Sequence, residues 1–247
     1  MKRYCSLLLL LLFVANLYSC KKKSNDDEEP YNCATCARTP QALAAHDNSA
    51  LGLYKGVIIG SSGVITFNLA NGGNTMTALM TIDGVTVNLS ANITYTAGSA
   101  LVGAFTGTMN GQPVTINFSV GASGGTPTVT SSNIPGHANA VFEIYKETSN
   151  SLIEAFEGTY DKPASGGGRE TGTFNVLIAR ALNGLRGVVR KTGATTFSRF
   201  TGTVTNNNIA LNTGNTNTVT GTISGDAISG ISTDSNGQGT FTGRRTL

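Results

Sequence analysis

The segment from Asp83 to Tyr95 reads DGVTVNLSANITY, and the interpretation of the whole chain starts from it. From Val85 onward every odd position is apolar or aromatic, and every even position is Thr, Asn or Ser. An alternation with a period of two is typical of a β-strand with one buried and one exposed face. The preceding pair, Asp83-Gly84, suits a tight hairpin turn in which both central residues have positive φ. This stretch therefore predicts a strand that is entered through a two-residue turn.

Equivalent turn signals recur along the chain. Asn110-Gly111, Asn183-Gly184 and Asn236-Gly237 predict the same turn, and Gly225-Asp226 fits the related type with Gly first. Two-residue loops at Asp83-Gly84 and Asn110-Gly111 place apolar residues opposite each other on one face. The expected pairs are Ile82 with Val85, Met80 with Val87, Ala78 with Leu89, Phe105 with Ile116, and Gly103 with Phe118.

The chain also repeats itself at an offset of about 100 residues. The segment Phe105-Thr-Gly-Thr-Met109 matches Phe200-Thr-Gly-Thr-Val204, and Thr66-Phe67-Asn68 matches Thr173-Phe174-Asn175. We therefore predict an all-β fold of two tandem antiparallel meander units, residues 51–147 and 151–247, with about eight strands each. Closure into up-and-down barrels would remove exposed strand edges. Two sandwiches or one larger continuous sheet remain alternatives.

This architecture resembles the calycin barrels, the lipocalin and streptavidin kind, in strand number and connectivity. No signature of those families is found in the sequence, so the resemblance implies a fold and carries over neither a ligand nor a residue.

The N-terminus indicates where the protein resides. Lys2 and Arg3 precede the apolar run of residues 7–14, which is too short to span a bilayer. Leu17-Tyr18-Ser19-Cys20 resembles a bacterial lipobox. The resemblance implies a signal peptide over residues 1–19 and a lipidated Cys20, with an ordinary cleaved signal as the alternative.

Residues 20–50 are predicted to form a charged tether, with ordered structure beginning at Leu51. Within this segment, residues 37–50 either hold a short helical turn or belong to the tether. The acidic run of residues 26–29 resembles the surface-export signal of Bacteroidota lipoproteins, although three lysines precede it and it lies further from Cys20. The resemblance covers residues 1–30 and implies an outer-membrane lipid anchor, with display on the cell surface as a further expectation. A plain hydrophilic spacer is the alternative.

Two cysteines, Cys33 and Cys36, lie in this tether. In an oxidising envelope we expect a local disulfide between them. A redox pair would normally open a helix of a βαβ fold, and a metal site would need two more ligands, of which His46 is the one nearby candidate.

Composition limits the functional classes. The chain has 17 Lys and Arg against 14 Asp and Glu, so loss of Lys2 and Arg3 with the signal peptide leaves a net charge of +1. Such a balance gives no general attraction to nucleic acid. The predicted inward face of the first unit holds no titratable group, and His137 has no Cys, Asp or Ser pattern beside it in the sequence. The residues predicted to face inward are Ile65, Phe67, Leu69, Met76, Met80, Ile82, Val87, Leu89, Ile93, Leu101, Phe105, Val114, Ile116, Phe118 and Phe142. We therefore predict no catalytic residues, no metal and no cofactor.

Glycines on the inward face of the second unit are one candidate site. The turns at Gly225-Asp226 and Asn236-Gly237 pair Gly221 with Gly230 and Gly230 with Gly243, and Gly202 shares their face. Missing side chains could leave a small ligand pocket near a barrel mouth. Alternatively, the glycines allow the barrel to coil, or an aromatic side chain fills the space.

A patch on the outward face of the second unit is the other candidate. Turns at Asn183-Gly184 and Gly193-Ala194 pair Leu177 with Arg190 and Val188 with Arg199, which assembles one patch of Leu177, Arg186, Val188, Arg190, Phe197 and Arg199. Arginine mixed with aromatic and aliphatic surface is typical of interface hot spots. The patch either binds an external partner or seats the two units against each other.

These observations predict a non-enzymatic, membrane-anchored lipoprotein that acts as a binding or accessory subunit for an outer-membrane protein or surface glycan. The alternative is a carrier that holds a small apolar ligand inside a calycin-like barrel.

Overall fold

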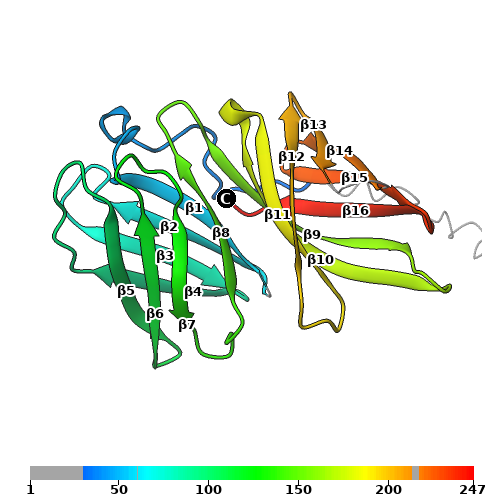
Figure 1. The fold of residues 1–247 in the computed structure, drawn as a ribbon, viewed down its shortest axis with the longest axis horizontal. Coiled ribbons are helices and arrows are strands. Elements are labelled where there is room, and N and C mark those ends of the chain that lie inside the picture. Colours follow the sequence, from blue (N-terminus) through cyan, green and yellow to red (C-terminus); the bar gives the residue numbers. More distant parts are fainter. Residues whose placement is uncertain (1–29, 60, 213–216) are drawn as a thin grey trace, which may run out of the picture. The chain divides into compact units, whose positions relative to one another are not determined.

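A computed structural model describes residues 30–59, 61–212 and 217–247. It consists of two eight-stranded antiparallel sheets that follow one another along the chain (Figure 1). The predicted all-β fold with two tandem eight-stranded units is therefore confirmed. The predicted signal peptide and Cys20 lie outside the described residues. No helix in the described ranges is long and apolar enough to cross a bilayer.

The first sheet is an up-and-down meander that is open along one seam. Its order is β7-β6-β5-β4-β3-β2-β1-β8, so the last strand returns to pair with the first while β7 and β8 remain the edges. Its strands are β1 (Gly52–Ile59), β2 (Gly63–Leu69), β3 (Met76–Ile82), β4 (Val85–Ala91), β5 (Leu101–Met109), β6 (Gln112–Val120), β7 (Thr128–Asn133) and β8 (Val141–Glu147).

The second sheet is a closed barrel in which every strand pairs with its sequence neighbours and β16 pairs with β9. Closure leaves no unpaired edge, as expected for an up-and-down barrel. Its strands are β9 (Ile153–Pro163), β10 (Arg169–Ala179), β11 (Gly184–Lys191), β12 (Ser198–Thr205), β13 (Asn208–Asn212), β14 (Thr218–Ser224), β15 (Ala227–Asp234) and β16 (Gly237–Arg245).

Several predicted turns are confirmed. Asp83 and Asn110 have φ of 46° and 51°, and the glycines that follow them have φ of 80° and 78°. The five apolar pairings expected from these two turns are all present. In the second barrel the turn at Gly225-Asp226 is also as predicted, and Gly221 lies opposite Gly230.

The prediction at Asn183-Gly184 is wrong. The connection is a four-residue loop containing the short 3₁₀ helix η3 (Arg180–Leu182), so Ala179 lies opposite Gly184, and Leu177 opposite Arg186 rather than Arg190. Arg180 explains the longer loop, because its guanidinium bonds to the Glu154 carboxylate and to the carbonyl oxygen of Asn206.

The turn predicted at Asn236-Gly237 is displaced by one residue. Asp234 lies opposite Gly237, so Gly230 pairs with Phe241, and the expected pairing of Gly230 with Gly243 is wrong. The Asp234 carboxylate accepts a hydrogen bond of 2.7 Å from the backbone N–H of Asn236, which selects this turn.

The interior of the first sheet is filled by apolar side chains. Phe67 stacks on Phe118 with ring centroids 4.4 Å apart, and Phe105 contacts Phe67 edge-on at 5.1 Å. Beyond Ala91 the predicted strand is not continued, and Ile93 instead occupies the space in front of Gly103. The predicted inward residues are buried, apart from Ile93 and Phe142, which pack partly buried against the same core.

The second barrel is packed differently, because its aromatic side chains lie along the wall. A Cβ added at Gly230 would meet Phe241 Cζ at 2.5 Å, and one added at Gly221 would meet the same atom at 2.7 Å. The ring of Phe241 therefore extends from β16 across β15 to β14. The ring of Phe174 extends in the same way from β10, so that added Cβ atoms at Gly158 and Gly243 would lie 2.6 and 2.9 Å from it.

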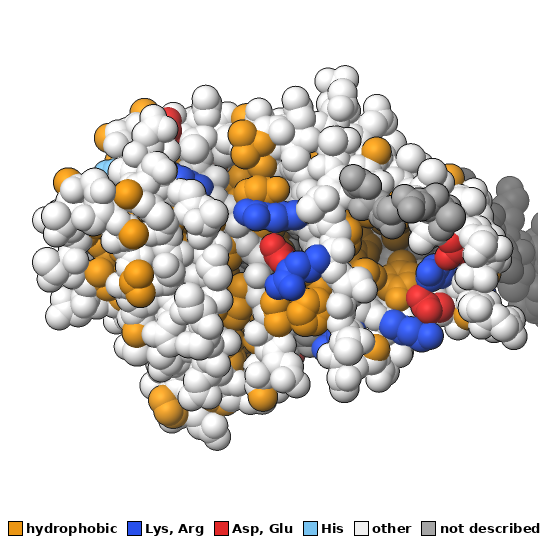
Figure 2. Space-filling view, viewed as in Figure 1, with side chains coloured by type: hydrophobic (Ala, Val, Ile, Leu, Met, Phe, Trp, Pro, Cys, Tyr) orange, Lys and Arg blue, Asp and Glu red, His pale blue; other side chains and the backbone are white. Residues whose placement is uncertain are grey.

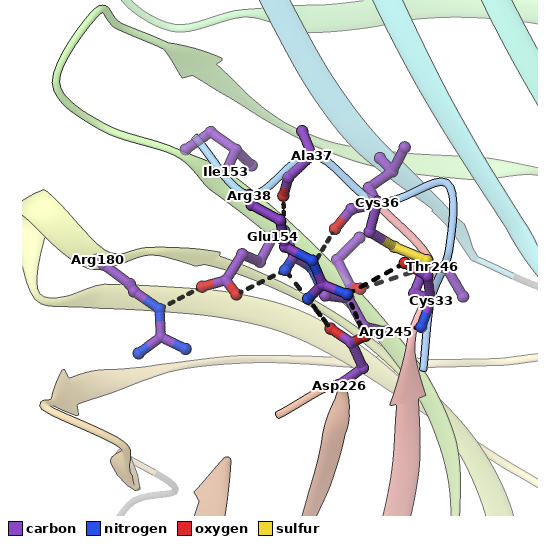
Figure 3. Close-up of polar contacts among 12 residues, drawn as sticks. Cys33, Cys36, Ala37, Arg38, Ile153, Glu154, Arg180, Asp226, Arg245 and Thr246 are labelled. Atoms are coloured by element: carbon purple, nitrogen blue, oxygen red, sulfur yellow. Dashed lines mark hydrogen bonds and ion pairs between the residues drawn. A yellow bond between two sulfur atoms is a disulfide. The ribbon is translucent and has the colours of Figure 1, made fainter. Parts of the chain in front are cut away.

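The segment before β1 is ordered, so the expectation that residues 31–50 form a tether is wrong. The alternative of a short helical turn within residues 37–50 is confirmed by the 3₁₀ helix η2 (Ala44–His46). Cys33 and Cys36 are joined by a disulfide and are both buried. The Arg38 guanidinium forms an ion pair with Asp226, which also accepts a 2.7 Å hydrogen bond from the Cys33 N–H (Figure 3).

A second buried carboxylate, Glu147, holds the next part of this segment. It accepts hydrogen bonds from the backbone N–H groups of Gln41 and Ile153, at 2.7 and 3.1 Å, and forms a 2.6 Å ion pair with buried Lys55. One side chain thereby connects the N-terminal segment, β1, β8 and the start of β9.

We predict that Gly230→Ala destabilises the protein by roughly 1–3 kcal/mol, since the new Cβ would clash with Phe241 and with the carbonyl oxygen of Thr220 on the adjacent strand. Urea denaturation would measure the free energy of unfolding. Ser229→Ala, on the outward face of the same strand, is the matched control. Equal stability of the two variants would contradict the packing described here.

We predict that Asp226 stabilises the fold above about pH 4 and loses this effect at lower pH. The hydrogen bond from Arg38 lowers the pKa of Asp226 from 3.8 to about 2. Because the pKa is lowered in the folded state, the stabilisation is lost as the pH falls from about 4 towards 2.

The measurement is the difference in free energy of unfolding between the native protein and Asp226→Asn across this range. The difference should shrink with acidification, and a difference independent of pH would contradict the prediction.

Candidate functional site

The second barrel encloses a cavity of about 640 Å³. Its wall consists of the inward faces of the strands, with alternate residues contributing as the pleat requires. Most of the deeper lining is apolar and includes Phe174, Val176, Leu185, Ile209, Ile228 and Phe241. The volume lies within the range of roughly 300–1,000 Å³ that is typical of small-molecule sites.

The cavity exists because the aromatic rings cover glycines on the wall. Phe241 and Phe174 lie over glycines of neighbouring strands and contact each other edge-on, with ring centroids 5.7 Å apart. Each ring thus occupies the space in front of a glycine, and both rings line the cavity that remains.

A charged collar surrounds part of the mouth; it consists of Lys162, Glu170, Lys191 and Asp234. Lys162 Nζ lies 3.2 Å from Asp234 Oδ2 and 3.7 Å from Glu170 Oε1, and Lys191 Nζ lies 3.1 Å from Glu170 Oε2. Figure 2 shows hydrophobic side chains within a hollow over this barrel, beside acidic and basic side chains.

The two carboxylates of the collar are held in the ionised form at neutral pH. Burial opposes ionisation of Glu170, but the hydrogen bond from Lys191 and the charge of Lys162 hold its pKa below the ordinary value. The backbone N–H of Asn236 and the ammonium of Lys162 lower the pKa of Asp234. Burial and the nearby Glu170 raise the pKa of Tyr160, which also lines the mouth, to about 12.

The opposite end of the barrel is sealed. Phe156, Ile178 and Ile223 fill it with apolar side chains. Beneath them the buried guanidinium of Arg245 lies 3.4 Å from Glu154 and 3.6 Å from Asp226, as Figure 3 shows.

The N-terminal segment completes this seal. Arg245 donates a 2.6 Å hydrogen bond to the carbonyl oxygen of Ala37, and Tyr31 donates one of 2.9 Å to the carbonyl oxygen of Arg245. The cavity therefore opens at the collar, away from this network.

None of the four predicted pocket glycines lines this cavity, although Gly221 and Gly230 border a separate, more open hollow of about 530 Å³. Phe241 covers Gly221 and Gly230, Phe174 covers Gly243, and Leu211 covers Gly202. Their role matches the alternative interpretation, in which side chains fill the space in front of them. The filling aromatic residues come from nearby strands of the wall, and the cavity that remains lies beyond them.

The predicted Arg-rich patch is largely an internal contact between the two sheets. Leu177 and Val188 are buried, and Leu177 packs with Val57 of β1, so the expectation of an exposed apolar surface is wrong for both residues. The predicted pairing of Val188 with Arg199 is present. Of the two proposed roles, the seating of one unit on the other is the one that the contacts support.

The arginines of the patch take part in the same contact. The Arg186 guanidinium stacks on the Tyr145 ring, 3.7 Å from its centroid, and donates a hydrogen bond to the carbonyl oxygen of Ile144 on the edge strand β8. Arg199 forms an ion pair with Glu143 and lies 5.2 Å from the centre of the Phe197 ring, and both Arg199 and Phe197 also line the cavity of the second barrel. Arg190 lies opposite Thr173 and is half-buried.

One cluster was missed because its members are distant in sequence. The Ser61 hydroxyl lies 2.7 Å from His137 Nδ1, and Asp83 Oδ2 lies 3.8 Å from His137 Nε2. This order of contacts is that of a nucleophile, base and carboxylate. The Asp83 carboxylate is half-exposed and lies beyond hydrogen-bonding distance of His137. We therefore assign a structural role to the cluster, which holds three loops together.

The collar was also missed, although the strand alternation contains its signal. Lys162 follows Phe156, Gly158 and Tyr160 in steps of two, and Glu170 precedes Phe174 in the same way. If the alternation of inward-facing and outward-facing residues is continued to the ends of these strands, Lys162 and Glu170 are predicted to face the barrel interior. Among the described residues no group of His, Cys, Asp and Glu is arranged to hold a metal ion.

Comparisons with known proteins give no match: a scan against protein-family models finds no family, and a search of curated proteins finds no relative. The fold and the geometry of the site therefore carry the functional argument.

We predict that Arg186→Ala lowers the free energy of unfolding by about 1–3 kcal/mol, because it removes the stacking on Tyr145 and a hydrogen bond to the edge of β8. Arg169→Ala, which removes an exposed ion pair with Asp161, is the control and should have little effect. A loss of stability no greater than that of the control would contradict the seating role.

Proposed function

We propose that this protein is a non-enzymatic binding protein that holds a small, largely apolar molecule in its second barrel. The observation that carries the proposal is the cavity of about 640 Å³, apolar in its depth and bordered by charged residues at its mouth. Apolar cavities with a few convergent polar groups are the usual form of small-molecule sites. The resemblance to calycin barrels points in the same direction.

The proposed location is the bacterial cell envelope. The lipobox-like residues 17–20 support lipidation at Cys20, and the acidic run of residues 26–29 supports a Bacteroidota-type outer-membrane lipoprotein. The disulfide between Cys33 and Cys36 is in keeping with an oxidising compartment. Exposure on the cell surface is part of the same proposal.

Docking of an outer-membrane protein or surface glycan receives less support. Arg186 and Arg199 are engaged with β8 of the first sheet, and Leu177 is buried beneath them. Residues that already contact another part of the chain are less able to bind an external partner. The cavity is therefore better supported than the patch as the binding site.

The collar favours binding over catalysis. A general acid or base works best with a pKa near the working pH. Here the pKa of Glu170 is held low, and that of Tyr160 is raised to about 12. Both groups keep one protonation state near neutrality, as suits a site that positions a ligand.

We predict that the chain of residues 21–247 binds the neutral apolar fluorophore N-phenyl-naphthylamine and that Val219→Trp abolishes this binding. Val219 lines the cavity, and the indole would occupy the ligand volume. Fluorescence enhancement on titration measures the affinity.

Thr220→Trp is the matched control, because the neighbouring residue of β14 points outward and is exposed. Binding by the native chain that survives in Val219→Trp, with both variants folded, would contradict the proposed site. Absence of binding by the native chain would contradict the proposed function itself.

A further inference from the structure

We propose that the ligand of the second barrel is an amphiphile whose head group is polar but carries no net charge, with the head at the collar and the apolar part in the cavity. This inference rests on the proposed function and specifies its ligand class. It follows from the charge balance of the collar and from the way in which its ion pairs are arranged.

The collar holds two cations and two anions on one wall of the mouth. Lys162 belongs to β9, Glu170 to β10, Lys191 to β11 and Asp234 to β15. Their formal charges cancel. Arg199 also lines the cavity and forms an ion pair with Glu143 of β8, so its charge is offset as well. The apolar lining below them includes Val176, Leu185 and Ile209.

Each lysine already faces a carboxylate. Lys162 lies between Asp234 at 3.2 Å and Glu170 at 3.7 Å, while Lys191 lies 3.1 Å from the other oxygen of Glu170. The hydroxyl group of Tyr160 donates a 3.3 Å hydrogen bond to Glu170, which also fixes that carboxylate. Glu170 is therefore the centre of the collar and contacts three of its neighbours.

An anionic head group would have to draw a lysine away from Glu170. The Glu170 carboxylate would then lose its partner and lie beside a second negative charge. Such an exchange is costly in a partly buried site, because a charge left without its partner keeps the desolvation cost and loses the attraction.

A cationic head group meets the converse problem, since it would compete with Lys162 and Lys191 for the same two carboxylates. An uncharged hydroxyl, ester or amide requires no exchange of ion pairs. It can hydrogen-bond at the mouth, where Ser198 and Ser232 also contribute hydroxyl groups to the lining. Discrimination between ligands then arises from what the collar disfavours as well as from what it binds.

The test compares decanol, decanoate and decylamine, which share one chain and differ in head-group charge at neutral pH. Each competes with N-phenyl-naphthylamine for the chain of residues 21–247. We expect decanol to displace the fluorophore at a concentration about ten-fold lower than that needed for either charged compound. Equal potency of the three would overturn the inference while leaving binding in the cavity intact.

Glu170→Gln provides the second arm. The variant keeps the shape of the side chain, gives the collar a net positive charge and removes the carboxylate partner of Lys191. Decanoate should then compete about ten-fold better than with the native chain, while decanol is unchanged.

Asp161→Asn is the matched control, because it removes a negative charge from an exposed position near the same end of β9. An equal gain for decanoate in both variants would indicate a general charge effect and overturn the inference. If the fluorophore itself does not bind the native chain, the proposed function fails together with the inference.

Discussion

The pairing of aromatic side chains with glycines along the barrel wall is the constraint on which the proposed site depends. Phe241 and Phe174 can lie over the wall because the strands beside them offer no side chain at the point of contact. A larger residue at Gly230 or Gly158 would clash with the ring and with a backbone carbonyl oxygen of the adjacent strand. The glycines thus set both the tight curvature of the sheet and the open volume at its centre.

The two units share an eight-stranded antiparallel arrangement but differ in how their interiors are packed. In the first sheet Phe67, Phe105 and Phe118 contact one another and fill the centre, and the sheet stays open between β7 and β8. An open sheet exposes the backbone of its edge strands, which invites unwanted pairing. Two arginines of the second unit contact β8, one of these two edge strands: Arg186 binds the carbonyl group of Ile144, and Arg199 pairs with Glu143.

The turns at Asp83-Gly84, Asn110-Gly111 and Gly225-Asp226 could be predicted from the sequence, because local backbone conformation governs them. The predictions at the other two turns failed because side-chain contacts select a different connection: Arg180 reaches Glu154, and Asp234 accepts a hydrogen bond from the backbone of Asn236. The sequence placed Leu177 and Arg186 correctly on one face, but strand alternation cannot distinguish a face covered by another sheet from one in water. The cavity was only partly foreseeable, since glycine positions do not reveal where the neighbouring rings lie.

The N-terminal segment has a mechanical consequence for a chain that is held at its start. Tension entering at Tyr31 reaches the closed end of the barrel first, through Arg245, and is then shared with Asp226 by the contacts of Cys33 and Arg38. The load is carried by the β14–β15 turn and the end of β16, so the strand ends that bear the collar stay outside its path. The proposed lipid anchor at Cys20 would thereby be mechanically separated from the mouth of the barrel.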